Sequence, residues 1–317
     1  MDLSINIILD NNMKSSSFLT SLPIVTLNHS TRPIENAIFS IVIPSWNNLD
    51  FLKVCINSIQ KNSRFKHQII IHLNESNDGT REWVEKNNLD YSHSETNIGI
   101  CYAMNIARTL ATTNYLVYFN DDMYACPDWD FWLYEEIKKQ NSIYFFISAT
   151  VIEPRDTGNE CVIAPFDFGT HPDNFNESAL LENFNNTKKE DWQGTTWPPC
   201  VVSTLLWDMV GGYSTEFSPG MYSDPDFTMK LWQLGVRNFK GVGNSRIYHF
   251  MSKSTGRLTF KADGSRIFLN KWGISSNLFT RFYLRRGSIW TGFLDAPQNN
   301  WKYKIKKQLN NIKRRFS

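Results

Sequence analysis

Residues 39–44 read Phe39-Ser40-Ile41-Val42-Ile43-Pro44, a run rich in β-branched side chains that ends in a proline. Such a run is typical of a buried strand in a parallel sheet. Apolar residues at helical spacing follow over 49–61, and a second strand-like run stands at 68–73. A helix opening at 97–99 and a third buried run at 115–119 repeat the alternation. This order predicts an α/β fold with a Rossmann-like, mostly parallel sheet flanked by helices.

The rest of the chain adds further elements to this pattern. We expect helices over 129–140 and 226–234, strands over 143–152 and 236–249, and an apolar run at 200–206. Residues 155–195 are rich in Asn, Asp and Gly, which favours loops. Thr80 is expected to cap the helix that follows the polar turn at 74–80.

Composition limits the class of protein. The 317 residues are 41% hydrophobic and 20% charged, the balance of a soluble globular protein. The net charge of +2 gives no overall nucleic-acid signature. Five scattered cysteines without a Cys-x-x-Cys pair predict free thiols in a reducing compartment. Because neither a signal peptide nor an apolar run of about 20 residues is present, we expect a cytoplasmic protein.

Two adjacent carboxylates follow the third predicted strand, in Asn120-Asp121-Asp122. Such a pair at a strand end is costly unless it is hydrated, hydrogen-bonded or bound to a cation. Hard cations such as Mg²⁺ and Mn²⁺ choose oxygen ligands and also bind substrate phosphates. The alternative is a pair of turn or helix-capping aspartates.

Other polar clusters stand at predicted element ends. Asp224 precedes a helix and is a candidate general base, whereas Asp226 is equally an N-cap candidate. His249 ends a strand, either as a structural histidine or as part of a cation site. Hydroxyls and cations follow it at 252–257, a composition suited to a pyrophosphate. Residues 44–47 and 74–78 end the first two strands, where ligands of open α/β sheets bind.

Taken in order, these motifs resemble glycosyltransferase family 2, which has the GT-A fold. The resemblance covers about residues 39–257. Its parts are the opening strand with Ser45-Trp46-Asn47, the turn Asn77-Asp78-Gly79-Thr80, the helix from Asn97-Ile98-Gly99 to Asn105, Asn120-Asp121-Asp122 in place of Asp-x-Asp, Gly211-Gly212-Tyr213 with Ser223-Asp224-Pro225-Asp226-Phe227, and Tyr248-His249.

The resemblance implies roles for these residues. Asp122 and His249 would bind Mn²⁺ or Mg²⁺ at the donor diphosphate, with Asp121 near the ribose or the metal. Asp224 would deprotonate the acceptor, which gives inversion at the anomeric carbon. The remaining residues expected to bind the nucleotide sugar are Pro44, Trp46, Asn47, Asn74, Asp78, Asn97, Gly99, Asn105, Lys253 and Arg257.

The chain departs from the family pattern at three positions. Leu73 stands where the family usually has an acid that contacts the base, so Asn74 is a candidate replacement. Ser223 stands where a Glu usually precedes the catalytic acid, and Asn120 replaces the first acid of Asp-x-Asp.

The resemblance also implies a domain order and a function. Residues 1–37 would be an N-terminal extension, 38–260 a GT-A catalytic domain and 261–317 a C-terminal helical segment. Within the catalytic domain, about 38–125 would bind the nucleotide sugar and about 126–260 the acceptor. The expected activity is inverting transfer from a nucleotide diphosphate sugar, by default a UDP-sugar, in cell-surface glycan or polysaccharide synthesis. The alternatives are a sugar-nucleotide nucleotidyltransferase and a non-catalytic sugar- or nucleotide-binding protein.

The acceptor side and the tail carry weaker signals. Trp192 and Trp197 could stack on a sugar, or pin their loop to the core, and Asp226 is a further acceptor candidate. The acceptor is expected to be a glycan or a lipid-linked molecule. Residues 300–317 place Trp301, Ile305, Leu309, Ile312 and Phe316 on one helical face among lysines and arginines. Such a helix suits peripheral contact with the anionic inner face of a membrane, or packs on the domain as a solvated terminal helix.

Overall fold

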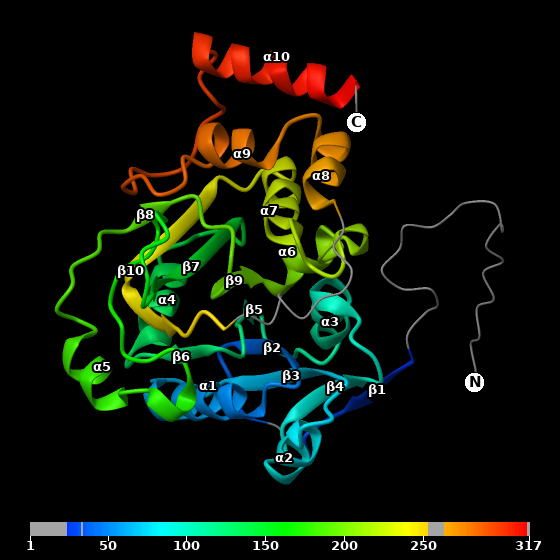
Figure 1. Cartoon of the computed structure of the whole chain (residues 1–317), viewed down its shortest axis with the longest axis vertical. Coiled ribbons are helices and arrows are strands. Elements are labelled where there is room, and N and C mark those ends of the chain that lie inside the picture. The colour runs from blue at the N-terminus through cyan, green and yellow to red at the C-terminus, as the bar shows by residue number, and fades with distance from the viewer. Residues whose placement is uncertain (1–23, 33, 253–262, 316–317) are drawn as a thin grey trace.

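The computed structural model describes residues 24–32, 34–252 and 263–315. Within these ranges the strands form one ten-stranded sheet in the order β1-β4-β3-β2-β5-β9-β7-β10-β6, with β8 paired to β10. From the pairings, six of the ten described strands run in the same direction, namely β2, β3, β4, β5, β7 and β10. Helices flank the sheet (Figure 1). The predicted α/β fold with a mostly parallel sheet is confirmed.

The first half of the sheet follows the predicted alternation. Its strands are β2 (Ser40–Trp46), β3 (Gln68–Asn74), β4 (Asp90–Ser94) and β5 (Tyr115–Tyr118), and its helices are α1 (Leu49–Asn62), α2 (Thr80–Lys86) and α3 (Gly99–Arg108). Strand β4 was not expected from the sequence, because four of its five side chains are polar or charged. It is nevertheless buried, and His72 Nδ1 on β3 lies 2.8 Å from Ser92 Oγ on β4.

The second half mixes strand directions. It contains β6 (Met123–Ala125), β7 (Phe145–Ile152), β8 (Trp192–Gln193), β9 (Cys200–Ser203) and β10 (Asn238–His249), with helices α4 (Trp129–Lys138), α5 (Glu177–Asn183), α6 (Thr204–Met209) and α7 (Ser223–Gln233) and the 3-10 turns η1 (Pro172–Asn174) and η2 (Thr215–Phe217). The apolar run at 200–206 divides into strand β9 and the start of helix α6. Helix α7 begins at Ser223, earlier than the sequence pattern predicted.

Side chains alternate between two cores on opposite faces of the sheet. Along β2, Ile41 and Ile43 belong to one apolar cluster, whereas Val42 belongs to the other. Because neighbouring side chains of a strand point to opposite faces, a strand covered on both sides needs apolar residues at every position. This burial explains why the decisive run at 39–44 is apolar almost throughout, and it fixes the strand ends as the places where polar residues gather.

The two ends of the described chain pack differently. Strand β1 (Val25–Asn28), within the expected N-terminal extension, pairs with β4 at the edge of the sheet. The C-terminal segment forms α8 (Gly264–Trp272), α9 (Ser276–Leu278), the π-helical turn η4 (Phe279–Tyr283) and α10 (Trp301–Arg315). These helices lie together at the end of the molecule away from α1 and α2 (Figure 1). Among the described residues, no helix combines the length and apolar character needed to cross a bilayer.

Candidate functional site

A cavity of about 380 Å³ opens at the carboxyl ends of β2, β3 and β5. The start of α3, the turn before α7 and the end of β10 complete its walls. The lining residues that the sequence had singled out are Pro44, Trp46, Asn74, Asn97, Gly99, Asp121, Asp122, Asp224 and His249. The fold therefore brings together residues from six separate parts of the chain, at the sheet edge where parallel α/β proteins bind ligands.

Asp121 and Asp122 have different partners inside this cavity. Ser45 Oγ donates to Asp121 Oδ2 over 2.8 Å, which ties the acidic turn to the end of β2. Asp122 is buried, accepts a hydrogen bond from the backbone N–H of Ser252 at 2.9 Å and lies 3.3 Å from His249 Nε2. Burial alone would raise the pKa of Asp122, but His249 and the Ser252 N–H outweigh it and lower that pKa overall.

His249 lies between two carboxylates. Its Nε2 faces Asp122, and its Nδ1 lies 3.0 Å from Glu153 Oε1 at the end of β7. Burial lowers the pKa of His249, yet the two carboxylates raise it to about 10. In the parallel pairing of β10 with β7, Tyr248 lies beside Ile152. The residues that follow them, His249 and Glu153, are therefore neighbours. Glu153 belongs to none of the family motifs. Only the register of the two strands indicates that it lies beside His249.

Asp122 and His249 have the chemistry of a divalent cation site. Their Oδ2 and Nε2 atoms lie 3.3 Å apart, and a cation that displaces the Nε2 proton would meet an oxygen and an imidazole nitrogen, which suit Mn²⁺. Mg²⁺ is often held by one or two carboxylates together with substrate phosphates. Within the part of the chain that the structure describes, no group of three or more His, Cys, Asp or Glu side chains is arranged to hold a metal. Asp122 and His249 offer one oxygen and one nitrogen, so a cation held there would need further ligands from a substrate.

Asp224 lines the same cavity from the first turn of α7. Part of its surface is open, although protein surrounds the carboxyl group on most sides. This burial raises the pKa of Asp224 to about 6, while a 2.8 Å hydrogen bond from Tyr213 Oη to Oδ1 lowers it. A carboxylate with such a pKa is ionised near neutral pH and is a stronger base than an exposed aspartate.

Asn105 was expected to bind the nucleotide sugar, but it lies outside the cavity wall. Its side chain accepts from the Tyr213 N–H and donates to the Tyr213 carbonyl, each over 2.8 Å. It therefore fixes the backbone of the residue that bonds Asp224.

The wall formed by α3 is shaped by backbone geometry. Asn97 Oδ1 accepts from the Gly99 N–H, and Asn74 Oδ1 accepts from the Ile98 N–H, each over 2.9 Å. Gly99 has a φ of +74°, and a Cβ atom there would lie 2.6 Å from the Cα of Pro219. Only glycine fits this contact between α3 and the turn before α7.

Glu75 lies in the turn at 74–78 that was expected near the ligand, but the sequence did not single it out. Its Oε2 accepts from Trp46 Nε1 at 2.8 Å and from Asn47 Nδ2 at 3.0 Å. Glu75 stands two residues after Leu73, the position where the family usually has an acid. The sequence indicated the polar turn after β3 as a whole, and the hydrogen bonds to Trp46 and Asn47 distinguish Glu75 within it.

Two expected residues lie in the turns around the cavity rather than in its lining. Asn47 Oδ1 accepts from the Asn77 N–H over 2.8 Å. Asp78 accepts from the Leu49 N–H at 2.9 Å and the Thr80 N–H at 3.1 Å. Asp78 thus ties α1 to α2, and the N-cap of α2 is Gly79. The prediction that Thr80 caps this helix was wrong, because Thr80 is already its first residue.

The three acceptor candidates lie away from the cavity. Trp192 is 2% exposed, stacks on Trp197 and donates from Nε1 to Thr150 Oγ1. Asp226 is fully buried and accepts hydrogen bonds from Trp272 Nε1 and Ser214 Oγ. The N-cap alternative for Asp226 was wrong, because α7 begins three residues before it. Lys253 and Arg257 fall outside the described residues.

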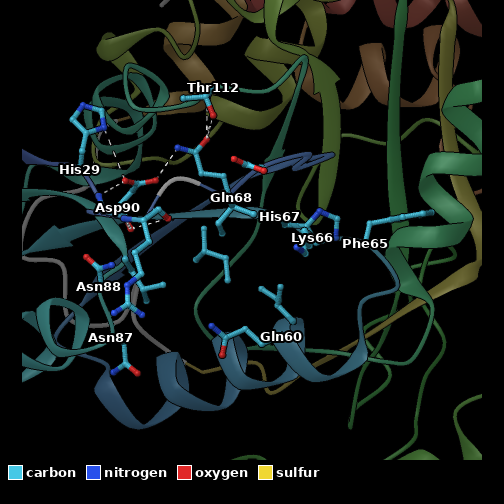
Figure 2. A pocket seen from close by; sticks show the side chains of 17 residues that line it. His29, Gln60, Phe65, Lys66, His67, Gln68, Asn87, Asn88, Asp90 and Thr112 are labelled. Carbon is cyan, nitrogen blue, oxygen red and sulfur yellow. Dashed lines mark hydrogen bonds and ion pairs between the residues drawn. The ribbon is translucent and has the colours of Figure 1, made fainter.

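A larger cavity of about 970 Å³ lies at the opposite end of the parallel strands, between the segment around His29 and helix α1. Figure 2 shows Gln68 and Asp90 pointing toward one another at the start of β3 and β4. Gln68 Nε2 donates to Asp90 Oδ2 at 2.8 Å, and Thr112 Oγ1 donates to Gln68 Oε1 at 3.0 Å. These polar groups satisfy one another, so size alone does not make this cavity the functional site.

Comparison with known proteins gives a family match for part of the chain. Residues 40–193 match Glycosyl transferase family 2. This match confirms the resemblance that the motifs predicted and ends before Asp224 and His249. No curated protein matches the sequence.

Solved structures with a similar fold include TarS and GalNAc-T7. Staphylococcus aureus TarS has a TM-score of 0.52 at 17% identity, over 88% of this chain and 44% of that one. TarS 1–349 in complex with UDP has a TM-score of 0.50 at 18% identity, over 67% and 60% of the two chains. GalNAc-T7 with UDP, GalNAc and Mn²⁺ has a TM-score of 0.54 at 14% identity, over 79% and 51%. The chain thus spans less than two thirds of these neighbours, and at these identities the likeness establishes the fold alone.

Proposed function

With residues 40–193 assigned to glycosyl transferase family 2, we propose that the chain transfers a sugar from a nucleotide diphosphate sugar to an acceptor hydroxyl. The observation that carries the proposal is the convergence of Asp122, His249 and Asp224 on one cavity. The last two lie beyond the matched region, so they support the proposal independently of the family match.

The proposed donor is a UDP-sugar with its diphosphate beside Asp122 and His249. TarS and GalNAc-T7 were each solved with UDP, and the latter with Mn²⁺ as well, which supports this choice. A bound Mn²⁺ or Mg²⁺ would supply positive charge to stabilise the departing diphosphate. Ser252 N–H and Glu153 hold the two candidate ligands in position. The nucleoside would lie along Trp46, whose indole Glu75 fixes.

The proposed general base is Asp224. Its carboxylate would take the proton of the acceptor hydroxyl while that oxygen attacks the anomeric carbon from the face opposite the diphosphate, which inverts the configuration. Tyr213 bonds one carboxyl oxygen and so fixes the plane of the group. This arrangement requires the acceptor to enter beside Asp224.

The proposed acceptor is a glycan or a lipid-linked molecule of cell-surface polysaccharide synthesis. Ile100, Gly220 and Met221 line the same cavity as Asp224 and add apolar surface to it, with Gly220 packed next to Ile100. Met221 is exposed, as a residue at the mouth of an acceptor channel would be. Contact of residues 300–317 with an anionic membrane would bring a lipid-linked acceptor within reach.

The decisive test is Asp224→Asn, assayed for UDP release and for donor binding. We expect transfer to be lost while the calorimetric affinity for a UDP-sugar persists, because the amide keeps the shape of the side chain but cannot accept the proton. Exposed Asp173→Asn is the matched control and should behave as the native chain. Full transfer activity in Asp224→Asn would show that the base is elsewhere.

The two alternatives give different results in the same assay. A non-catalytic sugar-binding protein would bind the donor without releasing UDP, and a nucleotidyltransferase would release pyrophosphate from a nucleoside triphosphate and a sugar phosphate. A thermal-shift panel of UDP-, GDP- and dTDP-sugars, with and without Mn²⁺, identifies the donor class. A ligand at 100 times its Kd stabilises the folded state by about 2.7 kcal/mol, which is measurable as a rise in Tm.

A further inference from the structure

Helix α10 packs on the protein through a narrow polar face. Tyr303 is 7% exposed and Asn310 is 6% exposed. Tyr303 Oη lies 3.0 Å from Tyr283 Oη, and the Tyr303 ring meets the Phe282 ring edge-on at 5.7 Å. The Asn300 side chain accepts from the Tyr303 N–H over 3.0 Å at the start of the helix. These contacts hold α10 against η4 in one orientation.

The apolar face of α10 points away from the protein. Its members Trp301, Ile305, Leu309 and Ile312 are 67%, 48%, 52% and 53% exposed. At about 100° of rotation per residue, these four lie within an arc of about 80°. Tyr303 and Asn310 fall on the opposite side of the helix. Phe316, also expected on this face, lies outside the described residues.

This orientation is the reverse of the usual one. A surface helix of a globular protein normally turns its apolar stripe toward the core and its charged residues toward water. Four large apolar side chains exposed in one row mark an interaction surface rather than a solvated helix. The segment was expected either to contact a membrane or to pack on the domain as a solvated helix. Only the face with Tyr303 and Asn310 packs on the domain.

Charge indicates what covers the stripe. Residues 301–315 contain seven basic residues and no acidic residue. By the helical rotation, Lys304 flanks one edge of the stripe, and Lys302 and Lys313 flank the other. An apolar stripe between rows of lysine is the pattern of a helix lying in the interface of an anionic membrane. A second copy of this chain fits poorly, because two such helices would bring like charges together.

We propose that the α10 stripe, defined as Trp301, Ile305, Leu309 and Ile312, is a membrane-contact surface for bilayers rich in anionic lipid. The four apolar side chains enter the boundary between headgroups and acyl chains, and the flanking lysines contact lipid phosphates. Because α10 is fixed to η4, membrane contact sets the orientation of the whole molecule. In Figure 1, α10 lies at the outer end beyond α8 and α9, where a flat surface can reach it. This surface is independent of the proposed transfer chemistry.

The test is co-sedimentation of the full chain with vesicles of phosphatidylcholine alone, or with about 30% phosphatidylglycerol added to imitate an anionic leaflet. We expect binding to the anionic vesicles only, and weaker binding as salt increases. The double variant Ile305→Ser/Leu309→Ser should reduce partitioning at least about tenfold, because apolar insertion is lost. Lys302→Gln/Lys304→Gln should reduce it on anionic vesicles while the melting temperature stays unchanged.

The matched control is Leu205→Ser/Met209→Ser on α6, which removes two apolar side chains of similar exposure elsewhere. It should bind vesicles as the native chain does. Equal binding by Ile305→Ser/Leu309→Ser, or no binding of the native chain to either vesicle, would overturn the proposal. So would a dimer in light scattering that this variant abolishes, because a second copy would then be the occupant. None of these readouts needs transfer activity, so failure here is distinct from failure of the proposed function.

Discussion

Each end of the parallel strands has a cavity lined by polar side chains. The two sets of side chains differ in their hydrogen-bond partners. At the amino ends, Gln68, Asp90 and Thr112 bond one another, so their polarity serves the sheet. At the carboxyl ends, Asp122, His249 and Asp224 converge from distant segments. Like charges and buried carboxylates collected in this way cost stability, and such an arrangement is typical of a functional site. Whether the polar groups of a cavity are paired with one another therefore indicates a functional site better than the size of the cavity does.

The strongest test of this difference is Asp122→Asn. We expect transfer to fall about 100- to 1000-fold, the loss typical when one stabiliser of a developing charge is removed. Steady-state kcat with a saturating UDP-sugar measures the effect, and Glu95→Gln at an exposed position is the control. A variant that folds and retains native kcat would remove Asp122 from the proposed machinery.

Glu153 provides a second test of the site at the carboxyl ends, because it bonds the candidate metal ligand His249 without lining the cavity. A carboxylate on the far nitrogen of a ligating histidine fixes the ring and increases its basicity. We therefore expect Glu153→Gln to weaken Mn²⁺ binding about 10- to 100-fold, as loss of such a partner commonly does. Calorimetric titration of the chain with Mn²⁺ measures it without any turnover, against Glu182→Gln as control. Unchanged affinity would mean that Glu153 only packs the ends of β7 and β10.

The pH dependence of transfer in a Tyr213 variant tests the proposed role of Asp224 as general base. Burial raises the pKa of Asp224 to about 6, and Tyr213 opposes that rise. Transfer that needs the carboxylate should decline as pH falls through about 6. Tyr213→Phe removes the hydrogen bond that favours the ionised form, so this acid limb should move to higher pH. The profile of kcat/KM against pH shows the shift, with Tyr144→Phe as control. A simple loss of rate at every pH would indicate a structural role instead.

Sequence reasoning identified the parts of this fold that local pattern determines. Apolar strands such as 39–44 and the polar residues just after them were predicted, because burial between two helical layers dictates both. Strand β4 was missed, since its polar side chains are buried with partners that lie far along the chain, such as His72 on β3 for Ser92. Glu153 was missed for a related reason, because the register between β7 and β10 places it and no local sequence feature does.

Asp224 and Asp226 show most clearly where prediction from the sequence fails. Residues two apart on a helix point about 200° from each other, so one faces the cavity and the other faces α8. The start of α7 was predicted at Asp226 rather than at Ser223, and both aspartates therefore remained site candidates. A local error of three residues was enough to obscure which acid belongs to the site.

The smallest expected effect on transfer comes from the opposite end of the sheet. Gln68→Ala removes the hydrogen bonds that Gln68 makes with Asp90 and with the Thr112 N–H, which should lower the free energy of unfolding by about 1–3 kcal/mol. Because these groups only stabilise the strand starts, kcat/KM at a permissive temperature should stay within about twofold of native. Urea unfolding and initial rates on the same preparation separate the two quantities. A stable variant with strongly reduced transfer would contradict the distinction between the two ends, because it would show that the packing of the strand starts is coupled to the site at their carboxyl ends.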